Sequence, residues 1–83
     1  MNSRREIEET LSQLLVEMFE VDPAAIKPDA KLYEDLDIDS IDAVDLIVEF
    51  RSLTGKQIDP GVFKAVRTVQ DVVNAVSGIV GLP

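Results

Sequence analysis

The stretch EDLDIDSIDAVDLIVEFRSLTG, residues 34–55, decides the fold because it places a helix with two apolar sides in the middle of the chain. Asp39 or Ser40 can cap the start of this helix, and Gly55 suits the left-handed geometry that often ends one. At about 100° per residue, one side gathers an ordinary core stripe: Ala43, Leu46, Ile47, Phe50 and Leu53. The opposite side carries a second apolar row, Ile41, Val44 and Val48, beside the acids Asp42, Asp45 and Glu49.

The second apolar row has two interpretations. A central helix of a bundle is buried on both sides, in which case the row is simply more core. An 83-residue chain has few other residues with which to cover it. We therefore expect an exposed docking face, in which the acidic residues steer the encounter with a partner and the apolar row supplies contact area.

The rest of the chain predicts an all-α fold. Ser3 and Glu6 form a capping-box pattern, and apolar residues then recur at helical spacing to about residue 19. Residues 20–38 have no sustained period, so we expect a long loop with one turn after Asp22 and Pro23. The anchors expected for this loop are Leu32, Tyr33 and Leu36.

The last third of the chain predicts one short and one longer helix. Asp59 followed by Pro60 indicates a short helical turn, and Thr68 caps a final helix with valines at a period near 3.6. The whole is a small four-helix bundle with three main helices and one short helix. We expect a single domain spanning residues 1–83.

Composition excludes several function classes. The chain has no cysteine and no histidine, which removes thiol nucleophiles, the commonest zinc ligand and the usual general base. We therefore expect no enzyme. A net charge of −8 repels nucleic acids and anionic lipid surfaces and opposes self-association. A soluble cytoplasmic monomer with a basic partner is the expectation, with no nucleic acid and no membrane involved.

The acidic cluster around Ser40 invites comparison with a calcium loop. In a register that starts at Asp35, the required glycine falls at Ser40 and the bidentate glutamate falls at Leu46. Both positions fail, so no calcium loop and no metal-ligand set is predicted; weak divalent binding by the carboxylate cluster as a whole stays open. Ser40 itself is either a helix cap or a hydroxyl modified by another protein, because no histidine is present to activate it.

The segment LYEDLDIDSIDAVDLI resembles the attachment segment of acyl carrier proteins, in which Glu-Asp-Leu precedes an Asp-Ser-Leu-Asp motif. The resemblance extends to IDP and TVQDVV in the later helices and covers nearly the whole chain. It implies that Ser40 receives 4′-phosphopantetheine from coenzyme A through a magnesium-dependent phosphopantetheinyl transferase. The thiol of that arm then carries acyl groups as thioesters between enzymes of fatty acid, specialised lipid or polyketide synthesis.

The resemblance also assigns further site residues. Asp39 flanks the attachment point, and the surface for acyl-loading and acyl-processing enzymes with basic docking patches comprises Ile41, Asp42, Val44, Asp45, Val48 and Glu49. The usual glycine of the motif is replaced by Asp37, and basic residues follow the docking helix, so we expect a specialised carrier. The alternatives are an aminoacyl or peptidyl carrier, and an acidic helical adaptor in which Ser40 is never modified.

Overall fold

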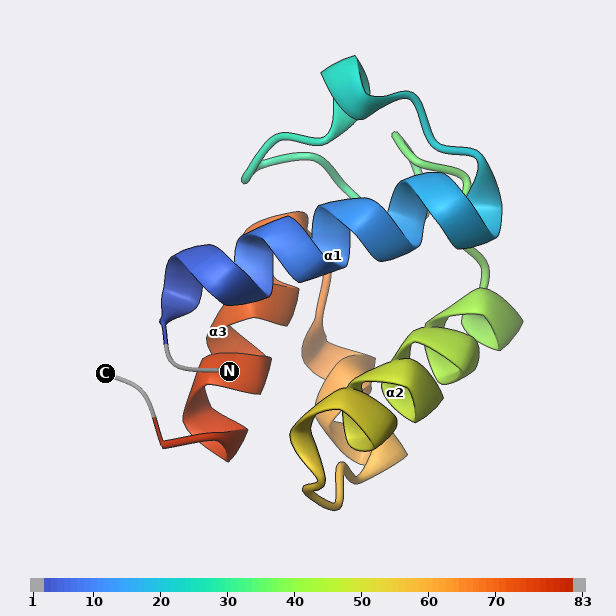
Figure 1. The fold of residues 1–83 in the computed structure, drawn as a ribbon. Helices are drawn as coiled ribbons and strands as arrows, with labels where there is room; N and C mark the ends of the chain where they lie inside the picture. The colour runs from blue at the N-terminus through green and yellow to red at the C-terminus, as the bar shows by residue number, and fades with distance from the viewer. Residues whose placement is uncertain (1–2, 82–83) are drawn as a thin grey trace.

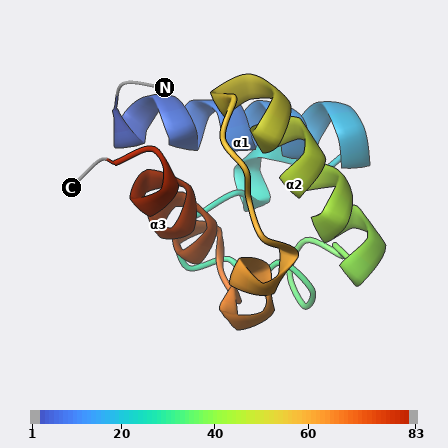
Figure 2. The ribbon, with the colours of Figure 1, turned by 90° about the horizontal axis from the view of Figure 1, so that it is seen from below.

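The computed structural model describes residues 3–81, except for the side chains of Pro60, Val62 and Phe63. This part of the chain is all-helical (Figure 1), with three α-helices and two short 3-10 helices: α1 (Arg4–Phe19), η1 (Pro23–Ala25), α2 (Ser40–Thr54), η2 (Pro60–Ala65) and α3 (Val69–Ile79). Helix α1 packs against α3, while η2 contacts both α2 and α3. A second view shows that η2 lies by α2 and α3 on the side away from α1 (Figure 2). The three predicted main helices are confirmed.

Helix α1 begins and ends where the sequence predicts. The Ser3 hydroxyl accepts a hydrogen bond from the backbone N–H of Glu6 at 3.1 Å and caps the first turn. At the other end Glu20 takes the left-handed conformation, with φ of 56°, and its N–H donates to the carbonyl of Val16. The inner face of the helix is fully buried and consists of Ile7, Leu11 and Leu15.

The loop between α1 and α2 is only partly anchored as predicted. Asp22 caps the short η1, and Leu32 and Leu36 are buried. Tyr33 was predicted as a third anchor, but its side chain is 45% exposed and the prediction is wrong. Residues 32–36 form a turn, in which the N–H groups of Asp35 and Leu36 both donate to the carbonyl of Lys31. Within this turn Leu32 and Leu36 face the core and Tyr33 faces solvent.

Backbone hydrogen bonds hold this loop against the start of α3. The N–H of Leu32 donates to the carbonyl of Arg67 at 2.9 Å, and the N–H of Val69 donates to the carbonyl of Ala30 at 3.0 Å. The N–H of Ile38 in turn donates to the carbonyl of Leu32 at 2.9 Å. The residues just before α2 are therefore fixed relative to α3, although they form no regular element.

Helix α2 has the predicted two-sided character. Leu46, Ile47 and Phe50 are buried, as the core stripe requires, and Gly55 ends the helix with φ of 67°. Leu53 was also placed in that stripe, but it is 52% exposed and the assignment is wrong. It lies in the last turn of α2, where the chain leaves the helix, so the core stripe ends one turn earlier than predicted.

The predicted short fourth helix is present only as 3-10 turns. Asp59 caps it as expected, because its Oδ1 accepts from the N–H of Gly61 at 2.9 Å. Six residues follow in the 3-10 helix η2 and no further α-helix is shown there. Short stretches of this kind often adopt the tighter 3-10 form. The turn extends through Val62 and Phe63, as expected, and ends at Ala65.

Helix α3 confirms the choice of helix over strand for the valine-rich segment. The Thr68 hydroxyl accepts from the N–H of Asp71 at 3.2 Å, and the Asp71 carboxylate accepts from the N–H of Thr68 at 3.1 Å. A capping box therefore starts the helix. Its buried face consists of Val69, Val72, Val73, Val76 and Ser77.

Substitution of two leucines on α2 by alanine tests where the buried stripe of this helix ends. Leu46→Ala removes a fully buried side chain and should lower the free energy of unfolding by about 2–5 kcal/mol. Leu53→Ala removes a half-exposed side chain and should cost less than about 1 kcal/mol. Urea denaturation of both variants measures the two losses. Equal losses would show that the stripe extends through the last turn.

The cap of α3 makes stability depend on pH. The backbone N–H groups of Arg67 and Thr68 both donate to the Asp71 carboxylate and hold its pKa below the ordinary value. A lowered folded-state pKa stabilises the fold above the ordinary pKa, and that contribution is lost as the pH falls through the folded-state value.

We expect Asp71→Asn to be less stable than wild type at neutral pH, with the difference shrinking once the pH drops below the ordinary aspartate pKa. Urea denaturation of both proteins across this acidic range measures the difference. A difference that stayed constant with pH would contradict the role given to the Asp71 charge.

Candidate functional site

The start of α2 is held by Asp39 and not by Ser40. The Oδ1 of Asp39 accepts from the N–H of Asp42 at 2.9 Å, and the Oδ2 of Asp42 accepts from the N–H of Asp39 at 3.3 Å. These two bonds form a complete capping box. Of the two cap candidates in the sequence, the structure selects Asp39, and Ser40 becomes the first residue inside the helix.

The Ser40 side chain is consequently available for reaction. It is exposed, and among residues 3–81 its hydroxyl has no hydrogen-bond partner. It stands at a helix N-terminus, where free backbone amides and the helix dipole favour a phosphate group. The residues present therefore fit a phosphate-linked arm at this position. Because the chain has no histidine, a general base for the hydroxyl has to come from another protein.

The sequence on both sides of Ser40 is acidic. Residues 34–49 include seven acidic residues and no basic residue. Two of these carboxylates belong to the capping box, and a third, on Asp35, accepts from the N–H of Lys31 at 2.8 Å. Within the described part of the chain, no group of three such side chains is arranged to hold a metal ion. The acids therefore act as caps and as a negative field around Ser40.

Asp37, three residues before Ser40, has an unusual backbone. Its φ is 59°, in the left-handed region that glycine adopts without cost. Aspartate is one of the few other residues that visit this region, because its short side chain can bond locally. The sequence comparison with the carrier motif places a glycine here, and the structure shows why. The turn into α2 needs a positive φ.

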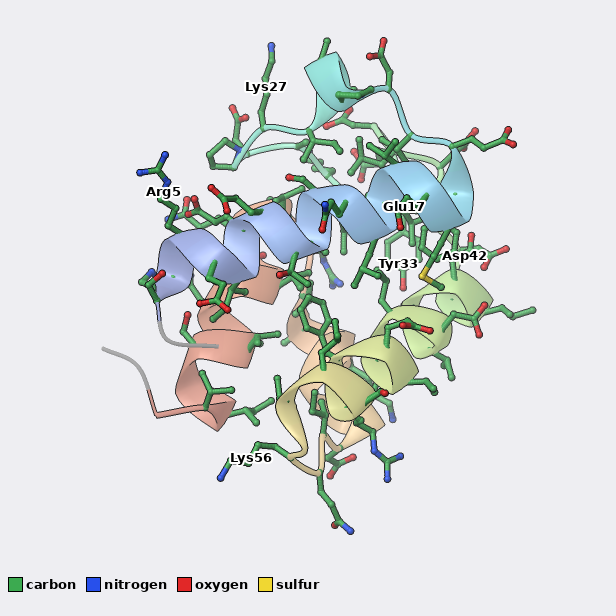
Figure 3. The ribbon with its side chains drawn as sticks, viewed as in Figure 1. Arg5, Glu17, Lys27, Tyr33, Asp42 and Lys56 are labelled. Atoms are coloured by element: carbon green, nitrogen blue, oxygen red, sulfur yellow. The ribbon has the colours of Figure 1, made fainter. Side chains whose placement is uncertain are left out.

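The predicted docking residues share the outer side of α2. The three apolar residues of the second row are exposed: Ile41 by 71%, Val44 by 49% and Val48 by 54%. Asp45 is exposed, and Asp42 and Glu49 are partly exposed. Asp42 lies at the first turn of α2 (Figure 3). The interpretation of the row as additional core is therefore wrong, and the structure brings all six residues to an accessible surface.

Ser40 lines none of three surface hollows, of about 780, 310 and 220 Å³. A shallow hollow of about 780 Å³ separates α1 from η1, and its lining includes Val16, Pro23 and Ile26 but not Ser40. An exposed hydroxyl outside these hollows is unsuited to enclosing a substrate. No helix within residues 3–81 has the length and apolar character needed to cross a bilayer.

Comparisons with known proteins agree with this geometry. Residues 9–76 match the family model described as a phosphopantetheine attachment site. Acyl carrier protein 2 of Ralstonia nicotianae is 49% identical over 74 residues, which cover 89% of this chain and 91% of that protein. The acyl carrier protein of Thermotoga maritima is 35% identical over 81 residues, which cover 98% of this chain and 100% of that protein.

Two single substitutions test which residue, Asp39 or Ser40, caps α2. Asp39→Ala removes the N-cap of α2 and should lower the free energy of unfolding by about 1 kcal/mol. Ser40→Ala removes a hydroxyl without a described partner and should change it by less than about 0.5 kcal/mol. Urea denaturation of the unmodified proteins measures both. A larger loss for Ser40→Ala than for Asp39→Ala would show that Ser40 caps the helix.

Proposed function

The chain belongs to the acyl carrier protein family, and we propose that Ser40 is the residue on which it carries 4′-phosphopantetheine. Members of this family are carriers and not enzymes, and the covalent arm supplies the thiol that holds the acyl group. The arm thus provides the sulfur that a chain without cysteine lacks. The observation that carries the proposal is the exposed Ser40 hydroxyl, free of the capping role that Asp39 has taken.

The proposed modification is a phosphoryl transfer from coenzyme A. A phosphoester bond forms between Ser40 Oγ and the phosphate of the pantetheine arm, and the pyrophosphate bond of coenzyme A breaks. The serine proton is lost to a base of the transferase, and adenosine 3′,5′-bisphosphate leaves. Asp39 flanks the site and keeps the helix end in place. A divalent cation held by the transferase offsets the nearby carboxylates.

The exposed row on α2 serves in this proposal as the docking surface for the transferase and for the enzymes that load and process the acyl group. Ile41, Val44 and Val48 supply apolar contact, and Asp42, Asp45 and Glu49 attract basic docking patches. Attraction of this kind raises the rate of encounter and weakens as salt is added. The exposure of all three apolar residues supports this role, because nothing in the described fold covers them.

Several finer assignments complete the proposal. The chain acts as a single cytoplasmic domain and as a monomer, which its net charge of −8 favours. Residues 60–65 serve as the short additional helix of the carrier fold. Asp37 in the turn and the basic residues that follow the docking row suit a specialised lipid or polyketide pathway. The named relatives favour an acyl cargo over an aminoacyl cargo or an unmodified adaptor.

Intact mass spectrometry tests the attachment residue. The protein is incubated with coenzyme A, magnesium and a broad-specificity phosphopantetheinyl transferase. We expect wild type to gain the mass of one phosphopantetheine unit and Ser40→Ala to gain nothing. The matched control is Ser52→Ala, which removes another exposed serine of the same helix and should be modified like wild type.

Two outcomes would contradict the proposal. Modification of Ser40→Ala would place the arm on another residue. Failure to modify the wild type, with its helical circular dichroism intact, would leave Ser40 as an unmodified helix residue of an acidic adaptor.

A further inference from the structure

An aromatic side chain stands exposed in the loop that leads to Ser40. Tyr33 is the single tyrosine of the chain, which has no tryptophan. Its side chain is 45% exposed, and among residues 3–81 its hydroxyl has no hydrogen-bond partner. Tyr33 therefore offers a ligand both an apolar ring and a group that donates and accepts hydrogen bonds.

The turn that carries Tyr33 is firmly held. The N–H groups of Asp35 and Leu36 donate to the carbonyl of Lys31 at 2.8 and 3.2 Å, respectively. The Asp35 carboxylate in turn accepts from the N–H of Lys31 at 2.8 Å. Leu32 and Leu36, which flank Tyr33 in the turn, are buried in the core. A ligand that packs against Tyr33 therefore has little backbone freedom to remove, and the contact costs little entropy.

This turn lies within reach of a group attached at Ser40. The N–H of Ile38 donates to the carbonyl of Leu32, the residue before Tyr33, at 2.9 Å. Because Ile38 is two residues before Ser40, the path through this bond from the Tyr33 Cα to the Ser40 Cα is shorter than about 20 Å. Figure 3 draws Tyr33 between the end of α1 and the beginning of α2. A long flexible arm on Ser40 can therefore fold back onto the tyrosine.

The chemistry of the arm suits a tyrosine better than the acidic side chains nearby. Beyond its phosphate, phosphopantetheine is an uncharged chain of methyl and methylene groups, amides and a thiol. The seven carboxylates of residues 34–49 offer such a chain neither apolar area nor a hydrogen-bond donor. The Tyr33 ring can cover the apolar part of the chain, and the Tyr33 hydroxyl can bond to an amide.

Attachment at Ser40 favours even a weak contact with Tyr33. A short flexible tether keeps the two groups at an effective concentration in the millimolar range, so a small contact energy is enough to populate the contact. A partner protein has to reach Tyr33 from solution. Single exposed apolar residues are common on protein surfaces. Tyr33 differs from such residues by its fixed position close to the attachment residue.

We propose that Tyr33 binds the pantetheine part of the arm and holds it against the turn before α2. This inference rests on the proposed attachment at Ser40. The contact limits the volume that the arm samples while no partner is bound, and it breaks when a partner takes the arm into its own site.

The fluorescence of Tyr33 tests the contact directly, because no second tyrosine and no tryptophan adds to the signal. Quenching by acrylamide, an uncharged molecule that the acidic surface does not repel, is measured for the purified unmodified and phosphopantetheinylated proteins. Intact mass confirms each form. We expect a lower quenching constant in the modified protein, because the arm covers part of the ring.

A tyrosine at another position controls for general effects of the modification. The double variant Tyr33→Ala with Gln13→Tyr places the single tyrosine at an exposed position of α1. Gln13 lines the hollow between α1 and η1, which Ser40 does not line. Modification should therefore leave the quenching constant of this variant unchanged.

NMR of the modified protein separates the ring from the hydroxyl. Protons of the arm that lie over an aromatic ring shift upfield. We expect this shift in wild type and in Tyr33→Phe, which keeps the ring, and its loss in Tyr33→Leu, which keeps only an apolar side chain. Circular dichroism checks that the variants retain the helix content of wild type.

The outcomes distinguish this inference from the proposed function. Equal quenching constants for the two forms of wild type would overturn the contact while leaving Ser40 as the attachment residue, and would point to a partner protein as the ligand of Tyr33. An equal decrease in the Gln13→Tyr control, or upfield shifts that persist in Tyr33→Leu, would overturn the contact as well. Absence of modification would overturn the attachment at Ser40, and the contact with it.

Discussion

The reciprocal hydrogen bonds between Asp39 and Asp42 are the interaction on which the site depends. Through these bonds Asp39, the residue before the serine, caps the first turn of α2. The serine hydroxyl is therefore not needed as a cap. Ser40 is consequently placed in the first turn of α2 by its backbone, and its side chain is left exposed. Under the proposed function, a modifying enzyme would reach an exposed hydroxyl at a helix end that favours phosphate, without having to break a cap.

Helix α2 combines two demands that oppose each other. Leu46 and Phe50 on its inner side hold it in the core, while Ile41, Val44 and Val48 on its outer side remain in water. Exposed apolar side chains gain nothing for the fold, and neighbouring carboxylates repel one another. Both features become favourable only when a basic partner covers them. Under the proposed function, such a surface lowers the stability of the isolated protein and favours binding of a partner.

Local signals predicted most of the fold, and non-local contacts account for the errors. The predicted helix ends are found at Ser3, Thr68 and Gly55, because a cap acts within a few residues of the chain and leaves a local signal. Tyr33 and Leu53 were misplaced, because a side chain in a turn or in the last turn of a helix is buried only where another element packs over it. The bond between Leu32 and Arg67 has no local sequence signal. At the site, the sequence could not decide between Asp39 and Ser40 as the cap, and the resemblance supplied the role of Ser40.

The most direct test of the separation between cap and attachment residue is an amide NMR comparison of the unmodified and phosphopantetheinylated protein. If Asp39 alone caps the helix, attachment at Ser40 should shift residues close to it and leave the core amides of Leu46, Phe50 and Val72 unchanged. The Asp42 amide should remain bonded to Asp39 in both forms. Shifts spread through the core, or loss of that bond on modification, would show that the serine takes part in holding the helix.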